Sequence, residues 1–338
     1  MPVTIADLSK HLNLSVSTVS KALNGYPDVA ERTRVRVLAA ARELDYYPSA
    51  AARSLRRQKT NKIGMLSNYP ISRVGDYVAQ LITGAAVAAE EEGYNLVLYA
   101  TLGNKSAADQ LEQMRQICRA REVDGMLILW ASQINETVRL MESESLPFIV
   151  VARRIPNPQV SFVVADNLNG ARLLTHHLIE QGHQRIAFTS FPELGENAID
   201  RLAGYRQALE EAGLPYDEGL VFPITMAVES RYEAFNAMFN LPTPPTAIFA
   251  FNDPVAILAL QMATQRGLRV PDDIAIAGFD GMYTSLLTTP SLTTVQHPVP
   301  TLGKEAVEAL LARIRDRSLP PHRTILPVEL KIRQSTVR

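Results

Sequence analysis

Residues 15–25 decide the fold of the amino-terminal part, and they read Ser-Val-Ser-Thr-Val-Ser-Lys-Ala-Leu-Asn-Gly. This stretch predicts a short helix that begins after Ser15, because serine caps helices with its side-chain oxygen. One face of the helix carries the apolar residues that would be buried, namely Val19, Ala22 and Leu23. The other face is short and mostly polar, and it presents Val16, Ser17, Ser20 and Lys21 to solvent.

A preceding helix completes a helix-turn-helix motif. It is predicted to begin after Thr4, and Asn13-Leu14 forms the turn between the two helices. Its apolar stripe at helical spacing consists of Ile5, Leu8 and Leu12. In this motif the second helix lies in the major groove of DNA, where residues of its first turn reach base edges and polar residues around them hold phosphates. The motif therefore predicts sequence-specific DNA binding.

A third helix, predicted over residues 30–44, closes the small core of this part. The residues expected to be buried are Val35, Leu38 and Leu44, and the arginines expected on the surface are Arg32, Arg34, Arg36 and Arg42. The net charge of −1 hides an asymmetry, because residues 1–62 carry 11 Lys and Arg against 5 Asp and Glu, whereas the rest carries 23 against 30. A basic end beside a helix-turn-helix favours a polyanionic partner over arginines that merely solvate a helix.

The segment after the third helix predicts a conditional helix. Residues 49–56 read Ser-Ala-Ala-Ala-Arg-Ser-Leu-Arg, which are good helix formers behind a capping serine. A helix of only about two turns is marginal in water. We therefore expect it to form only when other groups support it.

Composition excludes several classes of protein. A chain of 338 residues with 46% hydrophobic and 20% charged residues is typical of a soluble globular protein with more than one domain. The longest apolar runs are too short to span a bilayer and the first residues show no signal-peptide pattern, so we expect a cytoplasmic protein. Cys118 is the only cysteine, which excludes an intrachain disulfide and a thiol-ligated zinc site. We expect Cys118 to be a small buried hydrophobe, and we predict no metal and no cofactor.

From residue 62 onward, short apolar strands alternate with longer amphipathic helices. Strands are predicted at residues 63–67, 95–99, 125–130, 148–151, 162–165, 186–189, 248–251, 274–278 and 328–333, and helices at 76–92, 107–121 and 135–145. Such alternation implies parallel sheets with helices on both faces. A stretch of about 275 residues exceeds a typical single core, so two subdomains are expected.

Several further stretches, in chain order, make the sequence resemble the LacI family of bacterial transcriptional regulators. Besides residues 15–25, they are Tyr46-Tyr47-Pro48, Ala52-Arg53-Ser54-Leu55, Val123-Asp124-Gly125, Arg201-Leu202-Ala203-Gly204-Tyr205, Phe251-Asn252-Asp253, Gly278-Phe279-Asp280 and Leu292-Thr293-Thr294-Val295. The resemblance implies an α/β fold in three parts. An all-α helix-turn-helix domain would occupy residues 1–47, a hinge helix and linker 48–61, and a periplasmic-binding-protein-like core 62–338.

The resemblance also implies how the core is arranged. It would consist of two doubly wound parallel-sheet subdomains, the first formed by residues 62–163 with 292–322 and the second by residues 164–291 with 323–338. The chain would cross between them near Val164, within 289–298 and within 321–325.

Polar residues follow the predicted strands at the edge where open parallel sheets bind ligands. Asp166 and Asp253 are typical of helix caps, the latter because a proline follows it, whereas Asn252 and Asp280 lack such a local explanation. The resemblance places Arg201, Asn252 and Asp280 in the effector pocket. An Arg fork, an Asn amide and an Asp carboxylate suit the adjacent hydroxyls of a sugar.

The remaining pocket residues carry alternatives. Tyr77 and Trp130 lie where the resemblance implies apolar walls, although such aromatic residues are also typical of a core. Many sugar-responsive relatives have Asp before an arginine pair that follows the fourth strand, where this chain has Ala152-Arg153-Arg154. A hydroxyl acceptor is therefore missing there, and Asp76 is a candidate to replace it. Asp166 is a further candidate effector contact.

The resemblance also implies how DNA is held. The expected DNA contacts are Thr4, Ser15, Val16, Ser17, Thr18, Ser20, Lys21, Asn24, Thr33, Ala52, Arg53 and Leu55. Hinge helices from two subunits would pair in the minor groove and insert Leu55 between central base pairs, with packing of Leu55 against the third helix as the alternative. Closure of the core would change the distance between the two hinges and so couple effector to operator. No leucine heptads follow the last strand, so we expect a homodimer on a pseudo-palindromic operator.

The predicted function is repression of genes for sugar uptake or catabolism, controlled by a small molecule that we expect to be a sugar inducer. A non-sugar effector or a corepressor is the alternative. A sugar-binding transport protein would share the core but would need a signal peptide and no DNA-reading part. An enzyme would need a phosphate loop, a nucleophile elbow or a metal cluster, and the sequence shows none of these. We expect His176-His177 and His183 to be solvated, on a surface helix and at its end.

Overall fold

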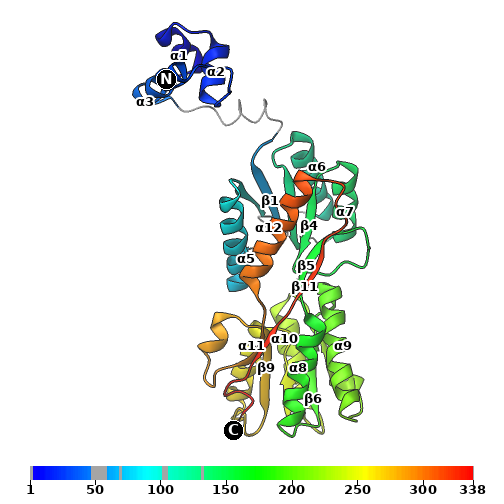
Figure 1. The fold of residues 1–338 in the computed structure, drawn as a ribbon. Helices are drawn as coiled ribbons and strands as arrows, with labels where there is room; N and C mark the ends of the chain where they lie inside the picture. The colour runs from blue at the N-terminus through cyan, green and yellow to red at the C-terminus, as the bar shows by residue number, and fades with distance from the viewer. Residues whose placement is uncertain (1–2, 47–58, 68–70, 101–105, 131–132, 338) are drawn as a thin grey trace. The chain divides into compact units, whose positions relative to one another are not determined.

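The structure is a computed structural model that describes residues 3–46, 59–67, 71–100, 106–130 and 133–337. The chain divides into two compact units, Met1–Asn61 and Lys62–Arg338 (Figure 1). The predicted hinge helix, with its expected DNA contacts Ala52, Arg53 and Leu55, lies outside the described residues.

The first unit is built from α1 (Ile5–Leu12), α2 (Val16–Leu23) and α3 (Glu31–Glu43). Both predicted caps are confirmed. The side chain of Thr4 accepts a hydrogen bond from the amide of Asp7, whose carboxylate accepts one from the amide of Thr4 in return. The side chain of Ser15 accepts from the amide of Thr18 at 3.0 Å. Residues close in sequence therefore fix where both helices begin.

The core of the first unit differs from the prediction on α3. Val35 and Leu38 are 57% and 40% exposed, so their assignment to the core is wrong, while Leu44 is partly buried against it. The residues that α3 buries are Val37, Ala40 and Ala41. The two alanines let the backbone of α3 approach the other helices closely. The spacing of apolar residues alone does not decide whether Val35 and Leu38 or Val37 and the alanines are buried, and the packing of the helices decides it.

The first sheet of the second unit is parallel, with the strand order β11-β5-β4-β3-β1-β2. Its strands are β1 (Lys62–Ser67), β2 (Asn95–Ala100), β3 (Gly125–Trp130), β4 (Phe148–Val151), β5 (Phe162–Ala165) and β11 (Arg323–Leu326). One face packs against α5 (Ile71–Glu91) and α12 (Val299–Arg315), and the other against α6 (Ala107–Ala120) and α7 (Ile134–Ser143). Burial on both faces explains why β4 and β5 read as continuous apolar runs.

The second sheet has the order β12-β10-β9-β8-β6-β7, in which β12 pairs antiparallel with β10. Its strands are β6 (Ile186–Ser190), β7 (Val221–Pro223), β8 (Ala247–Phe249), β9 (Ala275–Asp280), β10 (Thr293–Gln296) and β12 (Glu329–Lys331). One face packs against α8 (Asn167–Glu180) and α9 (Glu196–Glu211), and the other mainly against α10 (Val228–Phe239) and α11 (Asp253–Gln265). Short 3-10 helices are η1 (Pro192–Leu194), η2 (Glu218–Leu220) and η3 (Tyr283–Leu286).

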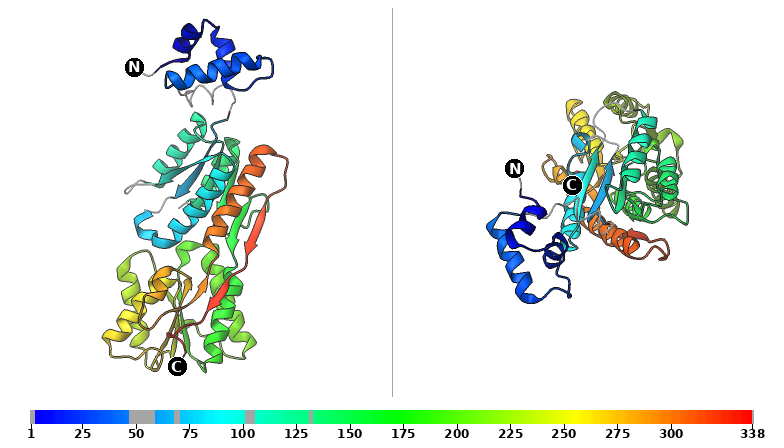
Figure 2. Two further views of the ribbon diagram at one scale, coloured as in Figure 1. Left: turned by 60° about the vertical axis from the view of Figure 1, so that its left-hand side comes forward. Right: turned by 90° about the horizontal axis from the view of Figure 1, so that it is seen from above.

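The chain crosses between the two subdomains at residue 166, at 297–298 and at 327–328, and the red carboxyl-terminal strands in Figure 2 run from one subdomain into the other. The crossing at 297–298 lies within the predicted range 289–298, whereas the subdomains assigned to residues 292–322 and 323–338 need correction. β10 pairs with β9 in the second sheet, although residues 292–322 were assigned to the first subdomain. β11 pairs with β5 in the first sheet, although 323–338 were assigned to the second. β10 follows β9 directly in the order of strands, whereas β11 and β5 are far apart in sequence, so no local pattern marks the second pairing.

Two expectations about single residues have different outcomes. Cys118 is buried, as expected. His177 is not solvated: it is 4% exposed, and its Nε2 lies 2.7 Å from Oγ1 of Thr336, so the prediction is wrong for this residue. The carboxyl-terminal segment covers this part of α8, which periodicity within the helix does not reveal. None of the described helices is long and apolar enough to cross a membrane.

Candidate functional site

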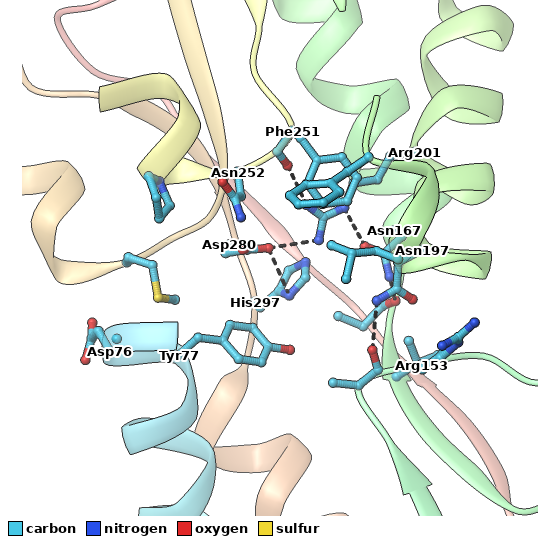
Figure 3. A pocket seen from close by; sticks show the side chains of 18 of the residues that line it. Asp76, Tyr77, Arg153, Asn167, Asn197, Arg201, Phe251, Asn252, Asp280 and His297 are labelled. Carbon is cyan, nitrogen blue, oxygen red and sulfur yellow. Dashed lines mark hydrogen bonds and ion pairs between the residues drawn. The ribbon is translucent and has the colours of Figure 1, made fainter. Parts of the chain in front are cut away.

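A cavity of about 260 Å³ lies between the two subdomains, at the carboxyl ends of strands from both sheets (Figure 3). Open parallel sheets bind ligands in this position. Its volume is close to the lower end of the range of about 300–1,000 Å³ found for drug-sized ligands, which favours a small ligand. The predicted effector residues that line it are Asp76, Tyr77, Arg201, Asn252 and Asp280.

Arg201, on α9, is the centre of a buried polar network. Its Nε donates to Oδ1 of Asn167 at 2.8 Å, its Nη1 to the carbonyl oxygen of Phe251 at 2.5 Å, and its Nη2 to Oδ1 of Asp280 at 2.8 Å. The guanidinium carbon is 4.4 Å from the ring centroid of Phe251 and 3.9 Å from that of Phe279. Because arginine has more N–H groups than these bonds use, both Nη atoms keep a donor for a ligand. The guanidinium is therefore held in a fixed orientation at the cavity wall.

His297 lies beside this network, just after β10, and was missed by sequence reasoning. It is 5% exposed, and neither ring nitrogen has a hydrogen-bond partner among the described residues. Nδ1 is 3.9 Å from Oδ1 of Asp280, and the ring packs edge-on against Tyr77 and Phe279. Burial lowers the pKa of His297 to about 4. The ring is thus neutral at pH 7 and can offer a ligand one donor and one acceptor.

The structure gives the capping role predicted for Asp253 to Asn252, which also lines the cavity. Asn252 is the cap of α11, because its side chain accepts from the amide of Val255 at 3.2 Å, so the expectation that it lacks a local role is wrong. Asp253 is fully buried and accepts from the amide of Met282 at 2.6 Å and the hydroxyl of Thr294 at 2.5 Å. Burial raises the pKa of Asp253 to about 8. The local sequence could not show this, because the partners of Asp253 are distant in sequence. The proline that follows is compatible with either Asn252 or Asp253 as the cap.

Asp166 caps a helix, whereas the next residue, Asn167, lines the cavity. Asp166 caps α8 by accepting from the amide of Asn169 at 3.0 Å, which confirms its structural interpretation. It is absent from the described residues that line the cavity, so the structure does not support it as an effector contact. Asn167 lines the cavity instead and orients Arg201.

Asp76 and Tyr77 enter the cavity from α5, where Gly75 interrupts the helix with a φ of 57°. Oδ2 of Asp76 accepts from the amide of Tyr283 at 3.0 Å, so this carboxylate joins the two subdomains besides facing the cavity. Tyr77 is buried among apolar residues of the first subdomain and also lines the cavity, so it has both of the roles considered for it. The side chain of Trp130 lies outside the described part of the chain.

The segment that follows β4 joins the subdomains on the side of the cavity opposite Asp76, where Figure 3 shows Arg153 beside Asn197. Arg154 donates to both carboxylate oxygens of Asp200, at 3.0 and 2.7 Å, and to Glu196 at 3.1 Å. Asn197 donates from Nδ2 to the carbonyl oxygen of Ala152 at 2.8 Å. Direct hydrogen bonds therefore hold the subdomains together on both sides of the cavity.

The surface predicted to read DNA is accessible within the first unit. Val16, on the first turn of α2, is 45% exposed. Thr4, Ser15 and Ser17 are exposed, and Thr18, Ser20, Lys21, Asn24 and Thr33 are partly exposed. The ammonium of Lys21 pairs with Asp28. The predicted contact residues described here are thus all at least partly exposed on the first unit.

A helix-turn-helix unit and a two-subdomain core with a cavity between its sheets define a class of ligand-responsive DNA-binding proteins. The model of "Bacterial regulatory proteins, lacI family" matches residues 4–49, and that of "Periplasmic binding protein-like domain" matches residues 175–336. The chain is 34% identical to the HTH-type transcriptional repressor PurR of Aliivibrio salmonicida (strain LFI1238), over 93% of each chain.

Solved structures are similar over the whole chain. The transcriptional regulator CelR–cellobiose complex is 29% identical, with a TM-score of 0.76 and coverage of 98% of this chain and 99% of that one. The lac repressor dimer bound to operator and the anti-inducer ONPF is 25% identical, with a TM-score of 0.87 and complete coverage of both chains. The chain belongs to the LacI family of bacterial regulatory proteins. This confirms the family and the fold class predicted from the sequence.

Proposed function

We propose that this protein is an operator-binding repressor whose affinity for DNA is controlled by a small molecule bound between the two subdomains. The chemistry of the cavity wall carries this proposal. Among the described residues, five buried side-chain atoms lack a hydrogen-bond partner, and four of them belong to residues that line the cavity. These four are Nε of Arg153, Oδ1 of Asn197 and both ring nitrogens of His297. Buried polar atoms without partners are rare and costly, so their concentration in one cavity favours a polar ligand.

The effector that we propose is a sugar that acts as an inducer. Arg201, Asp280 and His297 offer donors and acceptors side by side, and a sugar hydroxyl can both give and accept a hydrogen bond. Aromatic walls such as Tyr77 and Phe251 suit the apolar faces of a sugar ring. The cellobiose complex of the relative CelR supports this class of ligand. A non-sugar effector or a corepressor is the alternative.

The DNA contacts that we propose are those predicted at the N-cap of α1, on α2 and at its caps, at Thr33 on α3 and in the hinge. Val16 and Ser17 on the first turn of α2, with Lys21 one turn later, would read base edges, since an exposed apolar group suits thymine methyls and lysine suits guanine. Leu55 would act as a wedge in the minor groove.

A homodimer completes the proposal. Large apolar side chains are exposed on and just after η3, where Tyr283, Leu286 and Leu287 are 62%, 51% and 65% exposed. Val87 on α5 and Leu98 on β2 are also exposed. Exposed apolar groups of this size favour a protein interface. A two-fold dimer would match the symmetry of a pseudo-palindromic operator. We propose that the protein acts in the cytoplasm. The function needs binding and no catalysis.

Operator selection followed by fluorescence anisotropy tests the proposal. We expect the full-length protein to enrich a palindromic site from random duplex DNA and to be released from it by one member of a sugar library. Enrichment of no site would contradict the regulatory function. Tighter operator binding in the presence of the ligand would identify a corepressor and contradict the inducer.

A further inference from the structure

The cavity wall has an excess of positive charge. Among the described residues, the charged side chains that line it are Asp76, Arg153, Arg201, Arg231 and Asp280. Arg201 and Asp280 form an ion pair at 2.8 Å, and the neutral ring of His297 adds no charge. Arg153 and Arg231 have no ion-pair partner in the described part of the chain, and Asp76 is bound to the amide of Tyr283.

Arg153 forms no ion pair within the described residues, although the nearby carboxylate of Glu196 acts on it electrostatically. Its Nε is buried without a partner among the described residues, and burial lowers its pKa. The carboxylates on the first two turns of α9, Glu196 and Asp200, are bound by Arg154 instead. Gly195 precedes α9, and a Cβ atom there would collide with Nη2 of Arg153. The guanidinium thus lies against the amino-terminal end of a helix, which is itself positively polarised.

Arg231, on α10, approaches the same wall from the other end of η1. Its guanidinium carbon is 5.9 Å from the ring centroid of Phe191, which precedes η1, whereas Arg153 lies against Gly195, which follows it. Its hydrogen bonds go to backbone carbonyl oxygens at 3.4 Å, and burial lowers its pKa. Glu193 of η1 is exposed and, within the described residues, pairs with neither arginine. Two arginines therefore flank one short turn of the cavity wall.

We propose that the effector is an anion about the size of one sugar unit, a sugar acid or a sugar phosphate, whose charged group lies between Arg153 and Arg231. This inference rests on the proposed function, because it concerns the ligand of the same cavity. The hydroxyls of the ligand would face Asp280 and His297. A carboxylate or phosphate can form charge-assisted hydrogen bonds with both arginines. A neutral sugar would leave two desolvated guanidinium groups without an ion-pair partner among the described residues.

Calorimetry of the full-length protein with matched ligands tests the inference. The neutral members are D-glucose and D-galactose, the acids are D-glucuronate and D-galacturonate, and the phosphates are the two hexose 6-phosphates. We expect at least one anion to bind about ten- to a hundred-fold more tightly than the neutral sugar with the same ring. Its advantage should shrink as salt is added. The acid and phosphate arms distinguish the two sources of charge.

Substitution of both Arg153 and Arg231 provides a second test of the inference. The double variant Arg153→Gln, Arg231→Gln keeps polar side chains but removes the charges, so the advantage of the anion should disappear. The ligand-free double variant should also melt at a higher temperature, because two desolvated charges that lack an ion-pair partner among the described residues have been removed. The matched control is Arg206→Gln, an α9 arginine outside the cavity whose guanidinium stacks on Tyr216, and it should leave the anion preference unchanged.

Three results would overturn the inference: neutral sugars that bind as tightly as the anions, anions that do not bind at all, or an unchanged anion affinity in the double variant. Operator binding is measured on the same samples. A protein that binds its operator and is released by a neutral sugar would keep the proposed function and lose only this inference. A protein that binds the anions but no operator would keep this inference and lose the proposed function.

Discussion

The helix-turn-helix unit and the cavity between the subdomains differ in whether their polar groups have hydrogen-bond partners. In the first unit, the caps Thr4 and Ser15 satisfy backbone amides three residues away, and the residues predicted to read DNA lie on the surface. In the cavity, polar side chains are buried, and those of Asn197 and His297 have atoms without partners. The first unit thus satisfies these polar groups internally, whereas polar atoms of the cavity wall have no partner among the described residues. Substitutions in the cavity should therefore change stability as well as binding, whereas substitutions of DNA-reading residues that cap no helix, such as Val16 and Ser17, should change binding alone.

The largest effect is expected for Arg201→Ala. The change leaves Asp280 without its ion-pair partner, which costs about 3–5 kcal/mol of folding free energy when the pair is buried. Effector affinity should fall about ten- to a hundred-fold, because charged hydrogen bonds are lost. Urea unfolding and calorimetry measure the two effects, and operator affinity of the folded variant serves as the control. A variant with wild-type stability and a normal effector response would show that Arg201 contributes neither to folding nor to effector binding.

A smaller effect is expected from the titration of His297. The pKa of this group is about 4 in the folded protein, against an ordinary value of 6.5. The unfolded chain therefore takes up the proton first as the pH falls, so the stability that this group contributes is complete above pH 6.5 and is lost as the pH falls through 4. A shift of this size corresponds to about 3 kcal/mol.

His297→Gln isolates this contribution. Between pH 7 and pH 4 the free energy of unfolding should decline less in the variant than in the wild type, as measured by urea unfolding at several pH values. Parallel curves would show that His297 is solvated in solution, and the contrast between the two regions would weaken.

Leu55→Ala should act on DNA binding alone. If Leu55 is a minor-groove wedge, operator affinity should fall about tenfold and DNA bending should decrease with it, while binding to random DNA, which depends on phosphate contacts, should hardly change. Fluorescence energy transfer across a labelled operator measures the bend. Equal bending by the variant and the wild type would assign Leu55 to packing against α3.

The smallest effect on total affinity is expected for the combined replacement of Val16 and Ser17. Val16 and Ser17 make single apolar or hydroxyl contacts with base edges, which are weaker than the bidentate pairs that contribute about 1–3 kcal/mol, so the preferred half-site should change while the melting temperature stays within error. A binding selection on the variant tests this. An unchanged consensus would remove these residues from base reading. A large loss of stability would mean that Val16 and Ser17 also have a structural role in the first unit.

Some features of this protein are determined by the sequence itself, and they are those whose partners are close in sequence. Thr4, Ser15 and Asp166 each cap a helix by accepting a hydrogen bond from the backbone amide three residues later. Most strands and helices follow from the spacing of apolar residues along the chain. Motifs in chain order were enough to predict the family, because they lie in unbroken stretches. The alternation of strands and helices predicted the parallel sheets for a similar reason, since each element carries its own apolar face.

Only the tertiary structure decided the features that depend on groups brought together from distant segments. Arg201 and Asp280 are 79 residues apart, and the buried role of Asp253 depends on Thr294, 41 residues away. The face of α3 that is buried, the sheets to which β10 and β11 belong, and the unpaired nitrogens of His297 likewise depend on packing. Local propensity constrains a residue only through its near neighbours, whereas burial and pairing depend on every segment that the fold places around it. That is why the DNA-reading unit could largely be predicted from the sequence, and the composition of the cavity could not.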